Sequence, residues 1–421
     1  MSTDIEKTVA RLKQFSTKDA ETWRRLAGGF MGEAEHLFRL LGSPMSAWSL
    51  AGTAWKLWRK KGVLGSLDTA KMLLSSPRAW LEANFESTHV QATLAAWGMH
   101  LDFAPDISGG AVFPYLESMA NQNFGMVIGK GGADTMIRAL EKMVVSADGA
   151  IVTGTEVTEI TASGGRATGI RLKSGETHTA TKAVIANVAP RAMSRLLPGG
   201  SGDASFDTAM RSFRYAPGTM MIHLALDDLP AWSAGAELRQ FAYVHLAPSL
   251  DAMAEVYQQA TAGLLPAEPI LVVGQPTAID PSRAPNGKHV LWVQVRMLPA
   301  AITGDAKGEI TPDHWDVVKE HYTERVLDII ERYAPGLRGK IIGRSVFSPL
   351  DLEHENPNLV GGDQLCGSHH LAQNFLFRPA RGFARGNTPV KHLHLVGAAT
   401  WPGAGTGAAS GFLLAQQLGG R

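Results

Sequence analysis

The chain has 421 residues, enough for two domains or two interleaved ones around a large core. Its hydrophobic content of 45% and charged content of 19% are those of a globular protein, and a formal net charge of +1 gives no overall field that favours nucleic acid. The single cysteine, Cys366, excludes a disulfide framework. The sequence shows no secretory signal and no stretch near the roughly 20 apolar residues of a membrane-spanning helix. We therefore expect a cytoplasmic protein, soluble or bound to a membrane surface.

Residues 1–124 are expected to form a helical cap, because the first hundred show no strand-like alternation and break at "LGSPMS" and "LSSPRAW". One part of this cap combines aromatic and basic side chains: Trp48, Trp55, Trp58, Arg59, Lys60 and Lys61. That mixture is typical of a helix lying in a membrane surface, and equally of a cap helix that packs its aromatic stripe inward. A peripheral membrane contact is therefore one of two interpretations.

Residues 125–200 change pattern. "GGADTMIRALEKMVVSADG" predicts a helix, because Met136, Ile137, Leu140 and Val144 are spaced along one helix face. Short strands follow in "AIVTGTEVTEITASGGRATGIRLKSGETHTATKAVIANVAP", with glycine-containing turns between them. Residues 201–384 then alternate strands, namely "TMMIHLAL", "PILVVGQP" and "HVLWVQVR", with one long helix, "WDVVKEHYTERVLDIIERYAPG".

Residues 385–421 carry the most distinctive motif. "HLHLVGAATWPGAGTGAASGF" runs from an apolar strand through a glycine-rich turn into a helix, and residues 403–408 formally fit G-x-G-x-x-[GA]. A dinucleotide-binding unit also needs a second strand and an acidic residue about 20 positions on, but too few residues follow. The loop alone is either a close-packed helix entry or a site where backbone N–H groups meet a polar ligand.

Several segments in order resemble the phytoene desaturase-like FAD-dependent oxidoreductases, in the branch typified by pyridine nucleotide-disulphide oxidoreductase domain-containing protein 2. They are the helix and strands of residues 125–190 and "KHLHLVGAATWPGAGTGAASG", with "PTAIDPSRAPNGKHVLWVQV", "ERYAPGLRGKIIGRSVFSPLDLE" and "FRPARGFARGNTPVKHLHLVGA" in support. The resemblance implies an α/β fold in which an incomplete FAD-binding domain, glutathione-reductase-like, is interleaved with a mixed-sheet substrate domain and a helical cap. The expected boundaries are 1–124 (cap), 125–200 and 385–421 (FAD-binding segments) and 201–384 (substrate domain).

The resembled family also has a βαβ unit bearing G-x-G-x-x-G, which holds the FAD pyrophosphate. Residues 1–124 contain no strand followed by such a loop; "DISGGAVF" has the wrong spacing. Three explanations are a separate small subunit that carries the unit, an artificial truncation, and a relic that lost its flavin. The first is preferred, because an incomplete α/β domain would expose sheet edges and apolar faces unless another chain covers them.

Matching positions imply which residues contact FAD. The backbone of Val157 would lie against the adenine, Asn187 would end a strand near the cofactor, and Gly397 with Ala398 would let the flavin approach. The loop N–H groups would face the ring where negative charge develops on hydride uptake. The loop positions concerned are Gly405, Thr406, Gly407, Ala408 and Ala409. Asn187 could instead cap a turn, and Ala408 stands where glycine is usual in the family.

Trp401 occupies a position where the family usually shows histidine, so an acid–base role is lost there. Its indole could stack on the flavin, line the substrate pocket or fill space in the core. Catalytic residues stay unknown; weak candidates are His100, Asp102, His369, His370 and Trp401, each histidine being more often structural than catalytic. No metal site is expected, because adjacent histidines rarely ligate together.

Two functional hypotheses follow. In the first, the chain is the large substrate-binding subunit of a heteromeric FAD-dependent dehydrogenase, oxidase or desaturase that acts on a hydrophobic or aromatic small molecule. In the second, it is a non-catalytic hydrophobic-ligand-binding protein derived from the same fold. The first is favoured, because the resemblance covers nearly the whole chain in family order.

Overall fold

The computed structural model describes residues 2–405 and 407–419, and the chain forms two compact units. The first unit comprises Met1–Asn123, Gly154–Ala216 and Asn356–Arg421. The second comprises Phe124–Thr153 and Pro217–Glu355. No helix in the described ranges has the length and apolar character needed to cross a bilayer.

The N-terminal part of the first unit is helical, as the sequence predicts. Buried Asp19 holds two of its helices together, since its carboxylate accepts hydrogen bonds from the backbone N–H groups of Glu86 and Ser87, just before α5. The helices are α1 (Ile5–Leu12), α2 (Thr17–Leu41), α3 (Ala47–Leu74), α4 (Pro77–Asn84), α5 (Thr88–Gly98) and α6 (Val112–Phe124).

Two small sheets complete the first unit. Strands β1 (Val157–Ser163), β2 (Arg166–Leu172) and β3 (Thr177–Thr179) form an antiparallel sheet. Strands β4 (Val184–Ala186) and β12 (Leu393–Leu395) come from distant parts of the sequence and pair in parallel. The remaining helices of this unit are α8 (Pro190–Leu196), α9 (Ala204–Arg211) and α13 (Ala409–Gly419).

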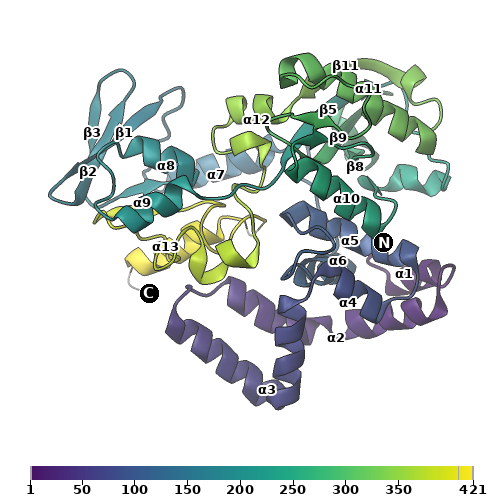
Figure 1. The fold of residues 1–421 in the computed structure, drawn as a ribbon, viewed down its shortest axis with the longest axis horizontal. Coiled ribbons are helices and arrows are strands. Elements are labelled where there is room, and N and C mark those ends of the chain that lie inside the picture. The colour runs from purple at the N-terminus through teal and green to yellow at the C-terminus, as the bar shows by residue number, and fades with distance from the viewer. Residues whose placement is uncertain (1, 406, 420–421) are drawn as a thin grey trace. The chain divides into compact units, whose positions relative to one another are not determined.

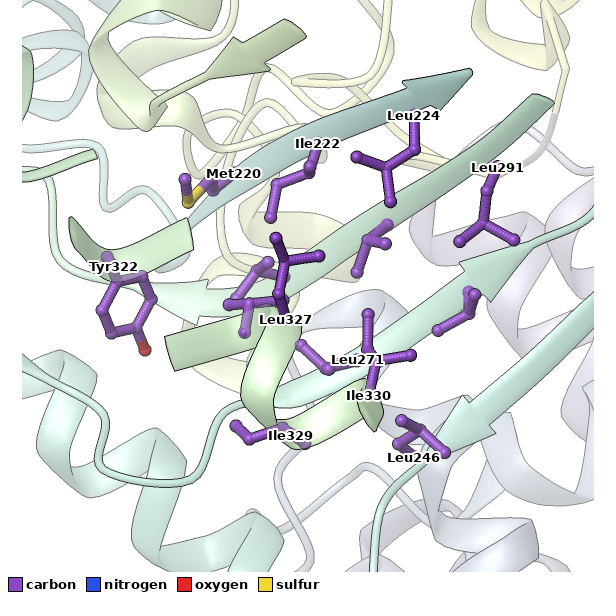
Figure 2. Close-up of a cluster of buried hydrophobic side chains, with 14 of the residues drawn as sticks. Met220, Ile222, Leu224, Leu246, Leu271, Leu291, Tyr322, Leu327, Ile329 and Ile330 are labelled. Carbon is purple, nitrogen blue, oxygen red and sulfur yellow. The ribbon is translucent and has the colours of Figure 1, made fainter. Parts of the chain in front are cut away.

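The second unit is built on a five-stranded sheet in the order β11-β5-β9-β8-β6. Helix α11 lies across it and places Tyr322, Leu327 and Ile330 over the inward side chains of the strands (Figure 2). The elements are α7 (Asp134–Ser146), β5 (Gly218–Leu226), β6 (Tyr243–Leu246), α10 (Leu250–Thr261), β7 (Leu264–Leu265), β8 (Ile270–Gly274), β9 (His289–Leu298), β10 (Gly304–Asp305), α11 (Trp315–Tyr333), β11 (Ile341–Phe347) and α12 (Pro349–Glu355) (Figure 1).

The predicted helix at α7, the strands β5, β8 and β9 and the helix α11 are all confirmed. The pairing differs from the expected mixed sheet, because all five strands are antiparallel and the short β7–β10 pair is parallel. Strands β8 and β9 are joined without an α-helical crossover, which antiparallel neighbours permit and parallel neighbours do not.

Candidate functional site

The candidate site lies at the carboxyl ends of β4 and β12. One face of this strand pair is buried against α8 and α9, through Val184, Ala186, Leu393, Leu395, Met193, Phe206 and Met210. Asn187 directly follows β4, and Gly397 lies two residues beyond β12. Because the strands are parallel, both residues lie at the same edge, which is where α/β sheets bind ligands.

Gly397 and Asn187 are in close proximity there. Gly397 has a φ of +102°, and a Cβ on it would lie 2.1 Å from the Asn187 Oδ1 atom. The Gly397 N–H donates to the Ser410 hydroxyl at 2.9 Å, and its carbonyl accepts from the Thr400 hydroxyl at 2.8 Å. Because Ser410 and Thr400 both bond to Gly397, the loop between β12 and α13 folds back onto its first residues. The structure brings together the predicted positions Asn187, Gly397 and Ala398.

The glycine loop exposes its tip. Gly405, Gly407 and Ala408 are exposed, and α13 begins at Ala409; the predicted contact Thr406 lies outside the described residues. The first N–H groups of α13 lack partners within the helix, as in any helix start, and so suit a polar or anionic ligand. Ala408 has a φ of +50°, which costs an alanine roughly 1–2 kcal/mol relative to ordinary helical backbone.

Trp401 packs into an apolar cluster of the first unit. It is buried, its indole N–H donates to the Ser43 carbonyl at 3.0 Å, and its ring lies 5.3 Å from that of Phe375. Met45 and Ala384 complete this apolar cluster. Of its three predicted roles, this geometry favours the structural one, in which Trp401 joins the loop after α2 to the last strand.

His369 and Arg378 fix the backbone of the loop between β12 and α13 by hydrogen bonds. His369 is buried, and its Nε2 accepts a hydrogen bond from the Ala404 N–H at 3.0 Å, so the neutral ring carries its proton on Nδ1. Burial and then the charge of Arg378 hold the pKa of His369 well below its ordinary value. His369 therefore positions the loop and stays neutral, which makes it unsuited to accept a proton.

Arg378, which the sequence did not single out, is fully buried. Its guanidinium donates to the Ser368 carbonyl at 2.8 Å and to the Ala398 carbonyl at 2.7 and 3.1 Å, and lies over the Phe213 ring. Burial lowers the pKa of Arg378 to about 10, so the cation persists at neutral pH. The guanidinium therefore fixes the backbone after β12 by hydrogen bonds to carbonyl oxygens. No local sequence pattern predicts this contact.

Asp363 is a second buried group that sequence reasoning missed. Its carboxylate accepts three hydrogen bonds of 2.8 Å, from the N–H groups of Ala216, Leu365 and Gly367. Burial raises its pKa to about 6 despite these bonds, and the charge of Asp102 acts in the same direction. Asp363 thus shapes the turn that leads to His369.

The other four catalytic candidates separate into different environments. The His370 Nε2 atom lies 2.8 Å from the backbone oxygen of buried Asp102 and 3.2 Å from its carboxylate. The hydrogen bond to the backbone oxygen places the proton of the neutral ring on Nε2. His100 instead lies against Trp97, with ring centroids 5.4 Å apart. Among the candidates, His370 is the histidine that Asp102 orients, through its backbone oxygen.

Val157 begins β1, is half-buried and pairs with Leu172. Its predicted contact with adenine stays a prediction. Within residues 2–405 and 407–419, no three His, Cys, Asp or Glu side chains are grouped so as to hold a metal ion.

A family model described as "Flavin containing amine oxidoreductase" matches residues 2–336. The chain belongs to the flavin-containing amine oxidoreductase family. It is accordingly an FAD-dependent oxidoreductase, which confirms the prediction from sequence.

Two relatives span nearly the whole chain. Pyridine nucleotide-disulfide oxidoreductase domain-containing protein 2 of Rattus norvegicus is 25% identical over 440 residues, covering 98% of this chain and 74% of the relative. Phytoene desaturase (neurosporene-forming) of Rhodobacter capsulatus is 28% identical over 435 residues, covering 99% and 75%. The crystal structure of an oxidoreductase from Methanosarcina mazei shares the fold, with a TM-score of 0.55, 20% identity and coverage of 86% and 72%.

The residues at the edge of β4 and β12 fit the ring end of FAD. Gly397 and Ala398 leave the strand end without bulky side chains, and the exposed turn before α13 presents backbone N–H groups. Bound FAD supplies the acceptor for a hydride. The N–H groups of the turn would stabilise the negative charge that accompanies its reduction.

Proposed function

We propose that this chain is the large, substrate-binding subunit of a heteromeric FAD-dependent oxidoreductase. A second, small polypeptide carries the βαβ unit with G-x-G-x-x-G and holds the FAD pyrophosphate at the start of its helix. The substrate is a hydrophobic or aromatic small molecule.

The observation that carries this proposal is the surface of α7. Its apolar residues Met136, Ile137, Leu140, Met143 and Val144 follow the spacing of a helix face that packs on a core, yet each is between 40 and 69% exposed. No residue of α7 is buried. Met126, Val127, Ile151 and Val152, on either side of the helix in the sequence, are exposed as well. An apolar surface of this extent in an otherwise well-packed unit supports the proposal that another protein covers α7.

The β4–β12 pair supports the same conclusion within the first unit. Parallel sheets are normally covered on both faces and rarely consist of two short strands. On the face opposite α8 and α9, Ile185 of β4 is exposed and His394 of β12 is half-buried. A partner with parallel strands of its own would extend this sheet, which is why we assign the role to a βαβ unit and not to an unrelated protein.

The substrate class is proposed by analogy with one relative. The name of the Rhodobacter capsulatus relative includes phytoene, which is a long apolar hydrocarbon. Within the chain, His370, which Asp102 orients, is the base available to take a proton from a substrate that gives its hydride to the flavin.

The proposal predicts a short open reading frame near this gene that encodes G-x-G-x-x-G, and co-expression with that reading frame tests the partner. We expect the two proteins to co-purify and to stay together at high salt, because salt does not weaken apolar burial. The double substitution Leu140→Asp and Met143→Asp should abolish co-purification. Val317→Asp, at an equally exposed apolar position on α11, serves as the matched control and should not.

Two results would contradict the heteromer. One is retention of the partner by the α7 double variant at the level of the Val317 control. The other is a native enzyme in which one continuous polypeptide contains both this sequence and the βαβ unit, as seen by intact mass measurement.

A further inference from the structure

Helix α3 is a 28-residue arm of the first unit with no buried residue. Gly62 adopts φ +69° and ψ −172° within it, so the helix bends there into segments 47–61 and 63–74 (Figure 1). Two ion pairs tie the arm to α2: Lys60 lies 3.1 Å from Glu35, and Lys61 lies 2.5 Å from Glu33. The Lys61 ammonium also donates to the Thr69 hydroxyl at 3.1 Å, which links the two segments across the bend.

Large apolar side chains cover both segments of this arm. Trp48 is 89% exposed and Leu64 is 78% exposed, while the others are between 43 and 61% exposed: Trp55, Trp58, Val63, Leu67 and Leu74. The rings of Trp55 and Trp58 lie 4.8 Å apart. Single exposed apolar residues are normal, whereas grouped exposed apolar residues are typical of interaction surfaces.

The net positive charge of α3 indicates that it binds an anionic surface. Helix α3 carries Lys56, Arg59, Lys60, Lys61 and Lys71 against one acidic residue, Asp68, a net charge of +4. Of the five bases, Lys56, Arg59 and Lys71 form no ion pair with any described residue. Protein–protein interfaces are depleted in lysine, whereas tryptophan beside lysine and arginine is typical of helices at the lipid–water boundary.

We propose that α3 docks on an anionic lipid bilayer. Its tryptophans lie at the level of the headgroups, its leucines and Val63 enter the acyl boundary, and its unpaired bases meet anionic lipids. Because no described helix can cross a bilayer, the contact is with one leaflet. This binding is independent of the partner proposed for the flavin site.

Vesicle sedimentation of the purified protein tests the proposal, with phosphatidylcholine vesicles and with phosphatidylcholine–phosphatidylglycerol vesicles. Wild type should bind the anionic vesicles, and the triple variant Trp48→Ser, Leu64→Ser and Leu67→Ser should bind at least about tenfold more weakly. The variant Lys56→Gln, Arg59→Gln and Lys71→Gln should lose about fivefold per charge on anionic vesicles, with little change on neutral ones.

Ile279, Val317 and Ile342 provide the control, since they are exposed apolar residues outside α3 and outside the α7 surface. Ile279→Ser, Val317→Ser and Ile342→Ser together should leave vesicle binding unchanged. The proposal is overturned if wild type fails to bind anionic vesicles, or if this control variant loses binding as much as the α3 variant. Loss of a protein complex by the α3 variant, without vesicle binding by wild type, would assign the arm to a protein partner.

Discussion

Replacing Gly403 by alanine tests whether His369 positions the glycine loop. Gly403 has a φ of +100°, and a Cβ on it would lie 2.5 Å from the His369 Nε2 atom and 2.9 Å from its Cδ2. The ring cannot retreat without breaking its hydrogen bond to the Ala404 N–H. The substitution therefore adds two costs, backbone strain and the loss of this bond.

The expected loss of stability is about 1.5–4.5 kcal/mol: about 1–3 for the strained backbone and about 0.5–1.5 for the hydrogen bond. Gly175→Ala is the matched control, because Gly175 has a similar φ of +89° and a Cβ there meets no atom within 4 Å. Urea denaturation should show Gly403→Ala to be about 0.5–1.5 kcal/mol more destabilising than the control.

A double-mutant cycle completes the test. In a His369→Ala background the new methyl group meets no ring, so Gly403→Ala should cost no more than Gly175→Ala does. If Gly403→Ala lowers the free energy of unfolding equally in the wild type and in the His369→Ala variant, the His369 ring does not hold the loop.

Three further predictions concern the same loop and strand β6 of the second unit. Ala408→Gly should raise the free energy of unfolding by about 0.5–1 kcal/mol, because it relieves the positive φ; no change in thermal unfolding would show that the turn is relaxed. Gly407→Val should remove flavin from the assembled complex with an unchanged circular dichroism spectrum, whereas Gly175→Val should retain it. Burial, followed by the charge of Arg296, lowers the pKa of His245 to about 4, below its ordinary 6.5. Stability from this neutral histidine is present above pH 6.5 and falls by about 3 kcal/mol as pH drops to about 4; His245→Gln should flatten that fall, and an unchanged pH profile would refute it.

Local pattern was sufficient to predict much of the fold. The spacing of apolar residues located α7 and α11, and alternating apolar runs located β5, β8 and β9. The strand–glycine–helix motif of residues 385–421 also identified where Gly397 and Ala398 lie. These features depend on neighbours within a few residues, which is what a sequence pattern records.

The parts that sequence reasoning missed depend on contacts between distant residues. Arg378 is buried against carbonyl oxygens, and nothing in "FRPARG" distinguishes it from a surface arginine. His369 and His370 are neighbours in sequence, yet one binds the glycine loop and the other binds Asp102. The apolar stripe of α7 predicted a core helix, but only the structure shows that its face is exposed.

The most direct test of the heteromeric flavin site is the amount of bound FAD, measured by absorbance, in the chain alone and in complex with its partner. Size-exclusion chromatography with mass detection defines the species in each sample. We predict that the chain alone retains little or no FAD and that the complex retains a stoichiometric amount, because in the proposed heteromer the helix start that binds the pyrophosphate belongs to the partner. A stoichiometric yellow monomer of 45.0 kDa, purified without any partner, would contradict the account.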